Sequence, residues 1–308
     1  MQVFLPIAGT SLNLLLPFGL GGLVGFLSGM FGVGGGFLMT PLLMMMGIPP
    51  TVAAATDSCQ IVAASASGTF AHARMHNVDY KLGGLMLVGG LGGGAIGVQV
   101  IKVLRQLGNA DVLIMLTYVV VLGLIGGYMF VESLRALRGV SVARKEGHRP
   151  ARFARFLQRL PFQTDFPKSG IRHSVFVPVT LCALVGILAA IMGVGGGFIM
   201  IPAMVYLLRM PMHAAVGTDL FQILFTASGV TFMQASVNHT VDFLLAIVLA
   251  LGSTIGAQVG ARVSKRLRGE QLRIILSCLV LIVCVKMLYG LVATPTLLLS
   301  AAVEGGGH

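Results

Sequence analysis

Long apolar stretches separated by short polar segments recur along the whole chain. Runs of 18 or more apolar residues are typical of helices that cross a membrane. Two of the apolar runs are shorter, and a helix of about 11 residues rises only about 17 Å, roughly half of the hydrocarbon thickness. The pattern predicts helices at 14–31, 37–47, 51–72, 82–103, 110–131, 174–192, 198–208, 212–236, 241–262 and 273–292. We therefore expect an all-α, polytopic membrane protein.

A glycine-rich break follows the first long apolar run and recurs in the second half of the chain. Residues 32–37 read Gly-Val-Gly-Gly-Gly-Phe, and residues 193–198 repeat these six letters. A Thr-Asp-x-x-Gln pattern at 56–60 recurs at 218–222. Glycine inside a helix costs about 0.5–1 kcal/mol relative to alanine, so a break made twice indicates a site. The two halves read as a gene duplication within one domain.

A basic linker, residues 134–172, separates a first membrane repeat at 1–133 from a second at 173–308. It holds ten of the 21 Lys and Arg residues. Its segment 151–162 places apolar and basic residues on different helical faces, as in a helix that lies on an anionic membrane surface. A disordered linker is an equally weighted alternative, and a nucleic-acid-binding arm is a remote third.

The basic residues also predict how the chain is oriented. If each break forms a hairpin that enters and leaves on one side, each half makes an odd number of crossings, and the halves are inverted. With the linker cytoplasmic, 18 of the 21 Lys and Arg residues then face inward, as the positive-inside rule requires. Parallel halves would place the basic segment 262–273 outside. We expect two inverted repeats, each with a glycine-broken hairpin plus three transmembrane helices, and both termini in the periplasm.

Composition narrows the function classes. The chain is 56% hydrophobic and only 10% charged, well below the charge of soluble domains. The net charge of +11 lies in loops between apolar runs, which favours membrane orientation over nucleic-acid binding. The four cysteines lie in apolar runs without metal-ligand spacing, so we predict free thiols and neither a metal site nor a cofactor. No helix carries a nucleophile with a base, so we expect no catalytic residues and no enzyme.

The glycines of the two breaks are candidate anion ligands. Each break precedes a short helix, and the amides at a helix N-terminus carry about +0.5 elementary charge. Inverted halves would bring two such ends toward one centre. The alternative is that the glycines only permit a tight turn or close packing. The candidate residues are Gly34, Gly35, Gly36, Gly195, Gly196 and Gly197.

Asp57 and Asp219 each lie about two turns inside an apolar helix. A charged Asp near the bilayer centre costs about 2.5–3.5 kcal/mol, so equivalent carboxylates in both halves indicate a binding site. The alternative is that each Asp bonds to backbone groups that the break has freed. The neighbouring candidates are neutral side chains that suit sulfonate or carboxylate oxygens, although each could also join helices: Thr56, Gln60, Thr218 and Gln222.

The paired Gly-Val-Gly-Gly-Gly-Phe segments, each followed by a Pro-containing short helix and by Thr-Asp-x-x-Gln, resemble the sulfite exporter TauE/SafE family. This family is also called the toluene-sulfonate uptake permease family. The resemblance covers nearly the whole chain. It implies a multi-pass permease of the bacterial inner membrane for small sulfur-containing anions such as sulfite, sulfoacetate or other organosulfonates.

These observations predict a secondary transporter that exports a small sulfur-containing anion. A bound anion and an ionised Asp repel each other, so a proton would tend to travel with the anion. The expected partners are the anion, protons and membrane lipid, without nucleic acid. Three alternatives stay open: a permease for another small anion, a cation transporter that uses Asp57 and Asp219, and an anion channel. The sequence leaves open the substrate, the direction, the coupling ion and the oligomeric state.

Overall fold

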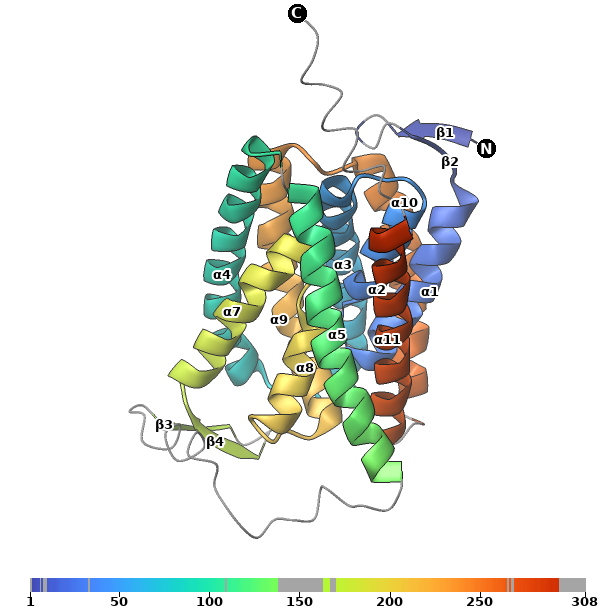
Figure 1. The fold of residues 1–308 in the computed structure, drawn as a ribbon. Helices are drawn as coiled ribbons and strands as arrows, with labels where there is room; N and C mark the ends of the chain where they lie inside the picture. Colours follow the sequence, from blue (N-terminus) through green and yellow to red (C-terminus); the bar gives the residue numbers. More distant parts are fainter. Residues whose placement is uncertain are drawn as a thin grey trace, which may run out of the picture.

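Helices that run side by side make up nearly all of the computed structural model (Figure 1). The structure describes residues 2–5, 7, 10–32, 34–108, 110–137, 163–166, 170–264, 266 and 269–293. The helices of the first half are α1 (Leu15–Phe31), α2 (Gly36–Met45), α3 (Pro50–Ala73), α4 (Tyr80–Gln106) and α5 (Ala110–Leu137). Those of the second are α7 (Phe176–Met192), α8 (Gly197–Tyr206), α9 (Met212–Met233), the π-helix η2 (Gln234–Asn238), α10 (Phe243–Ser264) and α11 (Gly269–Ala293). The predicted all-α fold is confirmed, and most helix ends fall within a few residues of their predicted positions.

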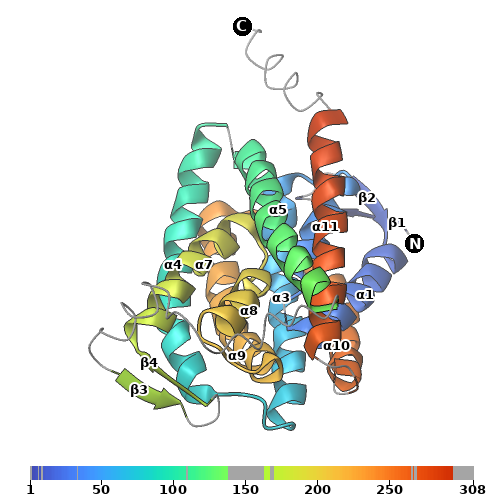
Figure 2. The same ribbon diagram turned by 60° about the horizontal axis from the view of Figure 1, so that its bottom comes forward.

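Four helices in the described part of the chain are long and apolar enough to cross a membrane. They are α4, the segment Ala110–Tyr128 of α5, α9 extended by η2, and α10. Helix α3 is equally long but rich in Ala, Ser and Thr, and most of its residues are buried. Figure 2 shows α3 near the middle of the bundle, and the helices that pack on it include α10, α9 and α2. Protein therefore surrounds the helix that carries Asp57.

Two short antiparallel hairpins, which the sequence did not predict, precede the first helix of each half. One pairs β1 (Gln2–Leu5) with β2 (Thr10–Asn13), and the other pairs β3 (Gln163–Phe166) with β4 (Ile171–Ser174). They lie at opposite ends of the bundle (Figure 1). The second hairpin falls partly inside the predicted linker, and α5 runs six residues beyond its predicted end. The proposed surface helix at 151–162 lies outside the described residues.

Helices from opposite halves pack backbone to backbone. Helix α1 of the first half packs on α10 of the second half. The equivalent pair is α7 of the second half and α4 of the first. Glycines make this possible: a methyl group added at Gly256 would overlap the carbonyl oxygen of Gly22, and one added at Gly93 would overlap that of Ala183. Small residues allow such close approach between helices in a membrane. Each half therefore supplies one helix to each of these two tightly packed pairs.

The π-helix η2 accounts for a change in the spacing of the repeat. Gln60 and its counterpart Gln222 are 162 residues apart, whereas His76 and its counterpart His239 are 163 apart. The second half therefore holds one extra residue between these points. A π-helix accommodates one inserted residue without changing the rest of a helix. The turn is held by a hydrogen bond of 2.6 Å from Asn238 Nδ2 to Gln234 Oε1.

Candidate functional site

Each glycine break reverses the backbone between a long helix and a short one. Gly32 ends α1 with φ 76°, and Gly35 precedes α2 with φ 86°. The second break repeats this geometry, with φ 72° at Gly193 and 85° at Gly196. These left-handed conformations disfavour any residue with a Cβ atom. The turn itself therefore requires glycine at these four positions.

The two breaks lie against each other. A methyl group added at Gly36 would lie 2.6 Å from Val194 Cα and 2.8 Å from the carbonyl oxygen of Gly193. The ring centroids of Phe37 and Phe198 are 6.1 Å apart. The break residues that sequence reasoning singled out in the two halves thus come together inside the bundle. Close packing of the breaks and a turn within each are both present.

The short helices α2 and α8 begin at these breaks without side-chain caps. Their N-cap residues, Gly35 and Gly196, make no side-chain hydrogen bond, and neither helix has an acidic residue in its first turn. The first amides of a helix have no partner within it. Neither short helix therefore carries an acidic side chain of its own at its positive end, and such an end favours an anion.

Tyr118 bridges the two breaks, and sequence reasoning did not identify it. Its hydroxyl donates to the carbonyl oxygen of Met192 at 2.8 Å and lies 3.3 Å from that of Gly36. Met192 is the last residue of α7, where carbonyl groups lack helical partners. The side chain is completely buried and comes from α5 of the first half. A tyrosine in an apolar helix is the only signal that the sequence offered.

Replacing Tyr118 by phenylalanine should destabilise the protein by about 1–2 kcal/mol, because it removes the donor and leaves buried carbonyl groups without it. The measurement is thermal unfolding in detergent, with Tyr289→Phe as the control. Tyr289 is 72% exposed on α11, so its hydroxyl should matter little. Equal melting temperatures for both variants would contradict a bridging role for Tyr118.

The two buried aspartates have different surroundings. Thr40 Oγ1 of α2 donates to Asp57 Oδ2 at 2.6 Å, whereas Asp57 Oδ1 has no hydrogen-bond partner among the described residues. Neither carboxyl oxygen of Asp219 has one. The counterpart of Thr40 at the spacing of 161 is Ile201, which cannot donate. The carboxyl groups are equivalent in sequence, but only one has a hydroxyl partner from its short helix.

The two glutamines also differ in their hydrogen bonds, but here the residue of the second half is the one with a partner. Gln222 Nε2 donates to Thr226 Oγ1 at 2.6 Å on the same helix. The counterpart of Thr226 is Ala64, and both the amide nitrogen and the oxygen of Gln60 are buried without a hydrogen-bond partner in the described part of the chain. A buried polar group without a partner costs about 1–3 kcal/mol, so Gln60 is a strong candidate for a ligand.

Thr56 and Thr218 hold the two halves together. The hydroxyl of Thr56 accepts a hydrogen bond of 3.1 Å from the amide of Asp242, and that of Thr218 accepts one of 3.0 Å from the amide of Asp79. These contacts agree with the alternative interpretation, in which the two threonines join helices. The role of both threonines in binding stays a prediction. Asp79 and Asp242 themselves cap α4 and α10, with Oδ1 accepting from the amide three residues onward.

A groove on the flank of the bundle lies apart from the predicted site. It is lined by Ala95, Ile96, Gln99, Val100, Val103, Leu104 and Met233, none of which is a predicted ligand. The residues that the structure describes include no group of three or more His, Cys, Asp or Glu side chains placed to hold a metal ion, and all four cysteines are free thiols.

Comparison with known proteins identifies relatives along nearly the whole chain. The family model "Sulfite exporter TauE/SafE" matches residues 17–287. "Probable membrane transporter protein YunE" of Bacillus subtilis is 26% identical over 283 residues, which cover 88% of this chain and 95% of that protein. "Probable membrane transporter protein YjnA" of the same organism is 27% identical over 267 residues, or 86% and 96% of the two chains.

A plant relative matches a shorter segment at higher identity. "Sulfite exporter TauE/SafE family protein 6" of Arabidopsis thaliana is 44% identical over 63 residues, which are 20% of this chain and 13% of that protein. No solved structure matches the chain significantly. The family model covers both glycine breaks and both Thr-Asp-x-x-Gln segments. The chain belongs to the sulfite exporter TauE/SafE family of membrane transporters.

Proposed function

We propose that this protein is a secondary transporter that exports a small sulfur-containing anion, such as sulfite or an organosulfonate, across the bacterial inner membrane. The observation that carries the proposal is that the two breaks, from which two helices without side-chain caps begin, lie against each other at Gly36 and Val194 inside the bundle. Two positive ends that face one centre attract an anion and repel a cation. The buried amide of Gln60, which has no described partner, supplies a donor on the neighbouring helix.

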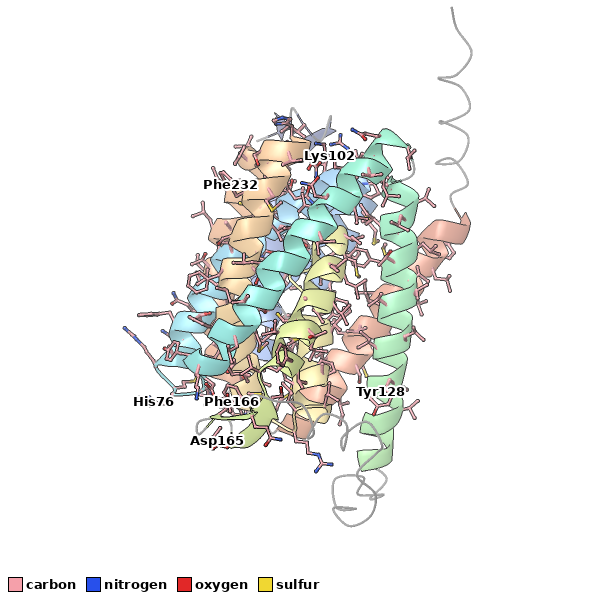
Figure 3. All side chains as sticks on the ribbon, turned by 90° about the vertical axis from the view of Figure 1, so that its left-hand side faces the viewer. His76, Lys102, Tyr128, Asp165, Phe166 and Phe232 are labelled. Carbon is pink, nitrogen blue, oxygen red and sulfur yellow. The ribbon has the colours of Figure 1, made fainter. Side chains whose placement is uncertain are left out.

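We infer that the two halves are inverted in the membrane, with the linker in the cytoplasm and the termini in the periplasm. The hairpins that precede α1 and α7 lie at opposite ends of the bundle (Figure 1). Figure 3 places Lys102 at one end and His76 and Asp165 at the other. Lys102 is one of the few basic residues that the inverted arrangement places on the periplasmic side. This distribution supports the topology that the positive-inside rule favours.

Proton coupling is the proposed role of the two aspartates. A buried carboxylate without a partner must be neutralised, and a proton is the simplest means. An anion that binds beside an ionised Asp is repelled, whereas it is tolerated beside a neutral one. Proton and anion would therefore move together. The membrane potential alone favours anion exit by about 2.3 kcal/mol per charge per 100 mV, so uncoupled export is the competing mechanism.

One observation favours a second candidate, a transporter for a cation. Both oxygens of Asp219 are buried without a described hydrogen-bond partner, and carboxylate oxygens are ligands for small cations. The positive helix ends oppose this function, and the anion transporter is therefore preferred. Competition by Na⁺ or a divalent ion for Asp219 would support the cation transporter.

Flux of labelled sulfite into proteoliposomes, with and without a pH gradient, tests the proposal. Asp57→Asn and Asp219→Asn should each lower the flux driven by the pH gradient at least about tenfold, because asparagine cannot carry the proton and a coupling free energy of this kind is about 1–3 kcal/mol. Asp111→Asn is the matched control, because Asp111 only accepts a hydrogen bond from the amide of Thr51 at the start of α3, which the asparagine oxygen can also accept. Unchanged flux in both variants would argue against a site at these residues.

A further inference from the structure

Two isoleucines fill the space beside the glycine breaks. Ile61 of α3 and Ile223 of α9 directly follow the glutamines of the two Thr-Asp-x-x-Gln segments. A methyl group added at Gly34 would lie 3.3 Å from Ile61 Cγ2 and 3.6 Å from Ile223 Cγ2. One added at Gly195 would lie 3.0 Å and 3.2 Å from the same two atoms. Both side chains thus lie beside both breaks.

These isoleucines form a small cluster apart from the main apolar core. Ile61 and Ile223 are completely buried and pack with Ala227 and with the partly buried Val62. The main core, which includes Phe37 and Phe198, is a separate cluster. The pair therefore makes a local apolar contact across the interface of the two halves.

The proposed ligands share helical faces with this pair. Residues three and four positions apart lie on one side of a helix, so Asp57 and Ile61 share a face of α3, with Gln60 beside them. Asp219, Gln222 and Ile223 have the same relation on α9. Each isoleucine therefore lies next to the polar side chains of its own helix and close to the glycines of both breaks. A solute that contacts the break and these side chains must also contact Ile61 and Ile223.

We propose that Ile61 and Ile223 form the size filter of the transport site, which limits how bulky the organic part of a transported sulfonate can be. This inference rests on the proposed function. A buried isoleucine is surrounded by closely packed atoms, so its volume is the space that a larger substrate would need. Truncation to alanine opens that space at the point where the two breaks meet. Because the two isoleucines are counterparts, each contributes to the same restriction from its own half.

The test compares two monoanions that have the same head group and differ in bulk, methanesulfonate and benzenesulfonate. Flux of each is measured in proteoliposomes for the full chain, for Ile61→Ala and for Ile223→Ala. We expect the ratio of benzenesulfonate to methanesulfonate flux to rise at least about tenfold in each variant. Ile114→Ala is the matched control, because Ile114 is equally buried but lies in the main core on α5.

An unchanged flux ratio in folded Ile61→Ala and Ile223→Ala, or the same rise in Ile114→Ala, would overturn the size filter and leave the proposed function intact. If neither alanine variant folds, Ile61→Val and Ile223→Val should give a smaller rise of the same sign, about threefold, and no rise would overturn the filter. A chain that moves neither sulfonate nor sulfite, and whose melting temperature responds to none of them, would overturn the proposed function and this inference together.

Discussion

Replacing Gly256 by alanine is expected to destabilise the folded protein strongly. The new methyl group would overlap the carbonyl oxygen of Gly22 and lie 2.6 Å from the amide nitrogen of Phe26. Both atoms belong to the backbone of α1, so no side chain can turn aside, and α1 and α10 must separate. Overpacking costs typically 1–3 kcal/mol and more where backbone must move, so we expect a loss of about 3 kcal/mol or more.

Size-exclusion chromatography and thermal unfolding in detergent measure this effect, with Gly92→Ala as the control. Gly92 lies in α4, and a methyl group there would meet nothing within 4 Å. Alanine in a helix is favoured over glycine by about 0.5–1 kcal/mol, so this control should fold at least as well as the original chain. A monodisperse Gly256→Ala protein with an unchanged melting temperature would show that α1 and α10 do not pack backbone to backbone.

Replacing Gly36 by alanine is expected to lower anion flux about 100-fold. Gly36 is the first residue of α2, and its backbone conformation permits alanine, so only space is at issue. The methyl group would lie 2.6 Å from Val194 Cα and 2.7 Å from Ile61 Cδ1. The two breaks would have to move apart by about 1 Å to restore normal contacts, and a displacement of that size at a reacting or binding centre can cost about 100-fold.

Labelled sulfite flux in proteoliposomes, normalised to folded protein, is the measurement for Gly36→Ala. Gly127→Ala is the matched control, since a methyl group at Gly127 of α5 would meet nothing within 4 Å. Flux in Gly36→Ala that equals flux in the control would mean that the breaks need not lie in contact for transport. If Gly36→Ala lowers the amount of folded protein but leaves the flux per folded protein unchanged, the contact between the two breaks serves stability alone.

Hydropathy predicted the helices well because lipid imposes a simple rule on backbone polar groups. Only helices or closed barrels satisfy them in a bilayer, so apolar runs of sufficient length become helices whatever their neighbours do. The breaks were visible for a related reason, because consecutive glycines between apolar runs have few structural uses. The hairpins β1–β2 and β3–β4 escaped prediction, since strands of four residues carry too little periodic signal.

The candidate site was only partly predictable, because hydrogen-bond partners depend on which helices touch. The sequence identified Asp57 and Asp219 as equivalents, but not that Thr40 bonds to one while Ile201 stands in the corresponding place near the other. Nor could it place Tyr118 between the two breaks. Such differences between the halves are single-residue differences in the sequence. Their effect on hydrogen bonding becomes clear only when the packing of α2, α3 and α5 is known.

The exchange of helices between the halves bears on how the protein would move during transport. The α1–α10 pair and the α4–α7 pair each combine one helix from either half, in backbone contact. Such pairs resist sliding or separation, so each pair would move as one rigid unit. The bodies that shift during alternating access would then be composites of both halves, and neither half alone would form a complete moving part.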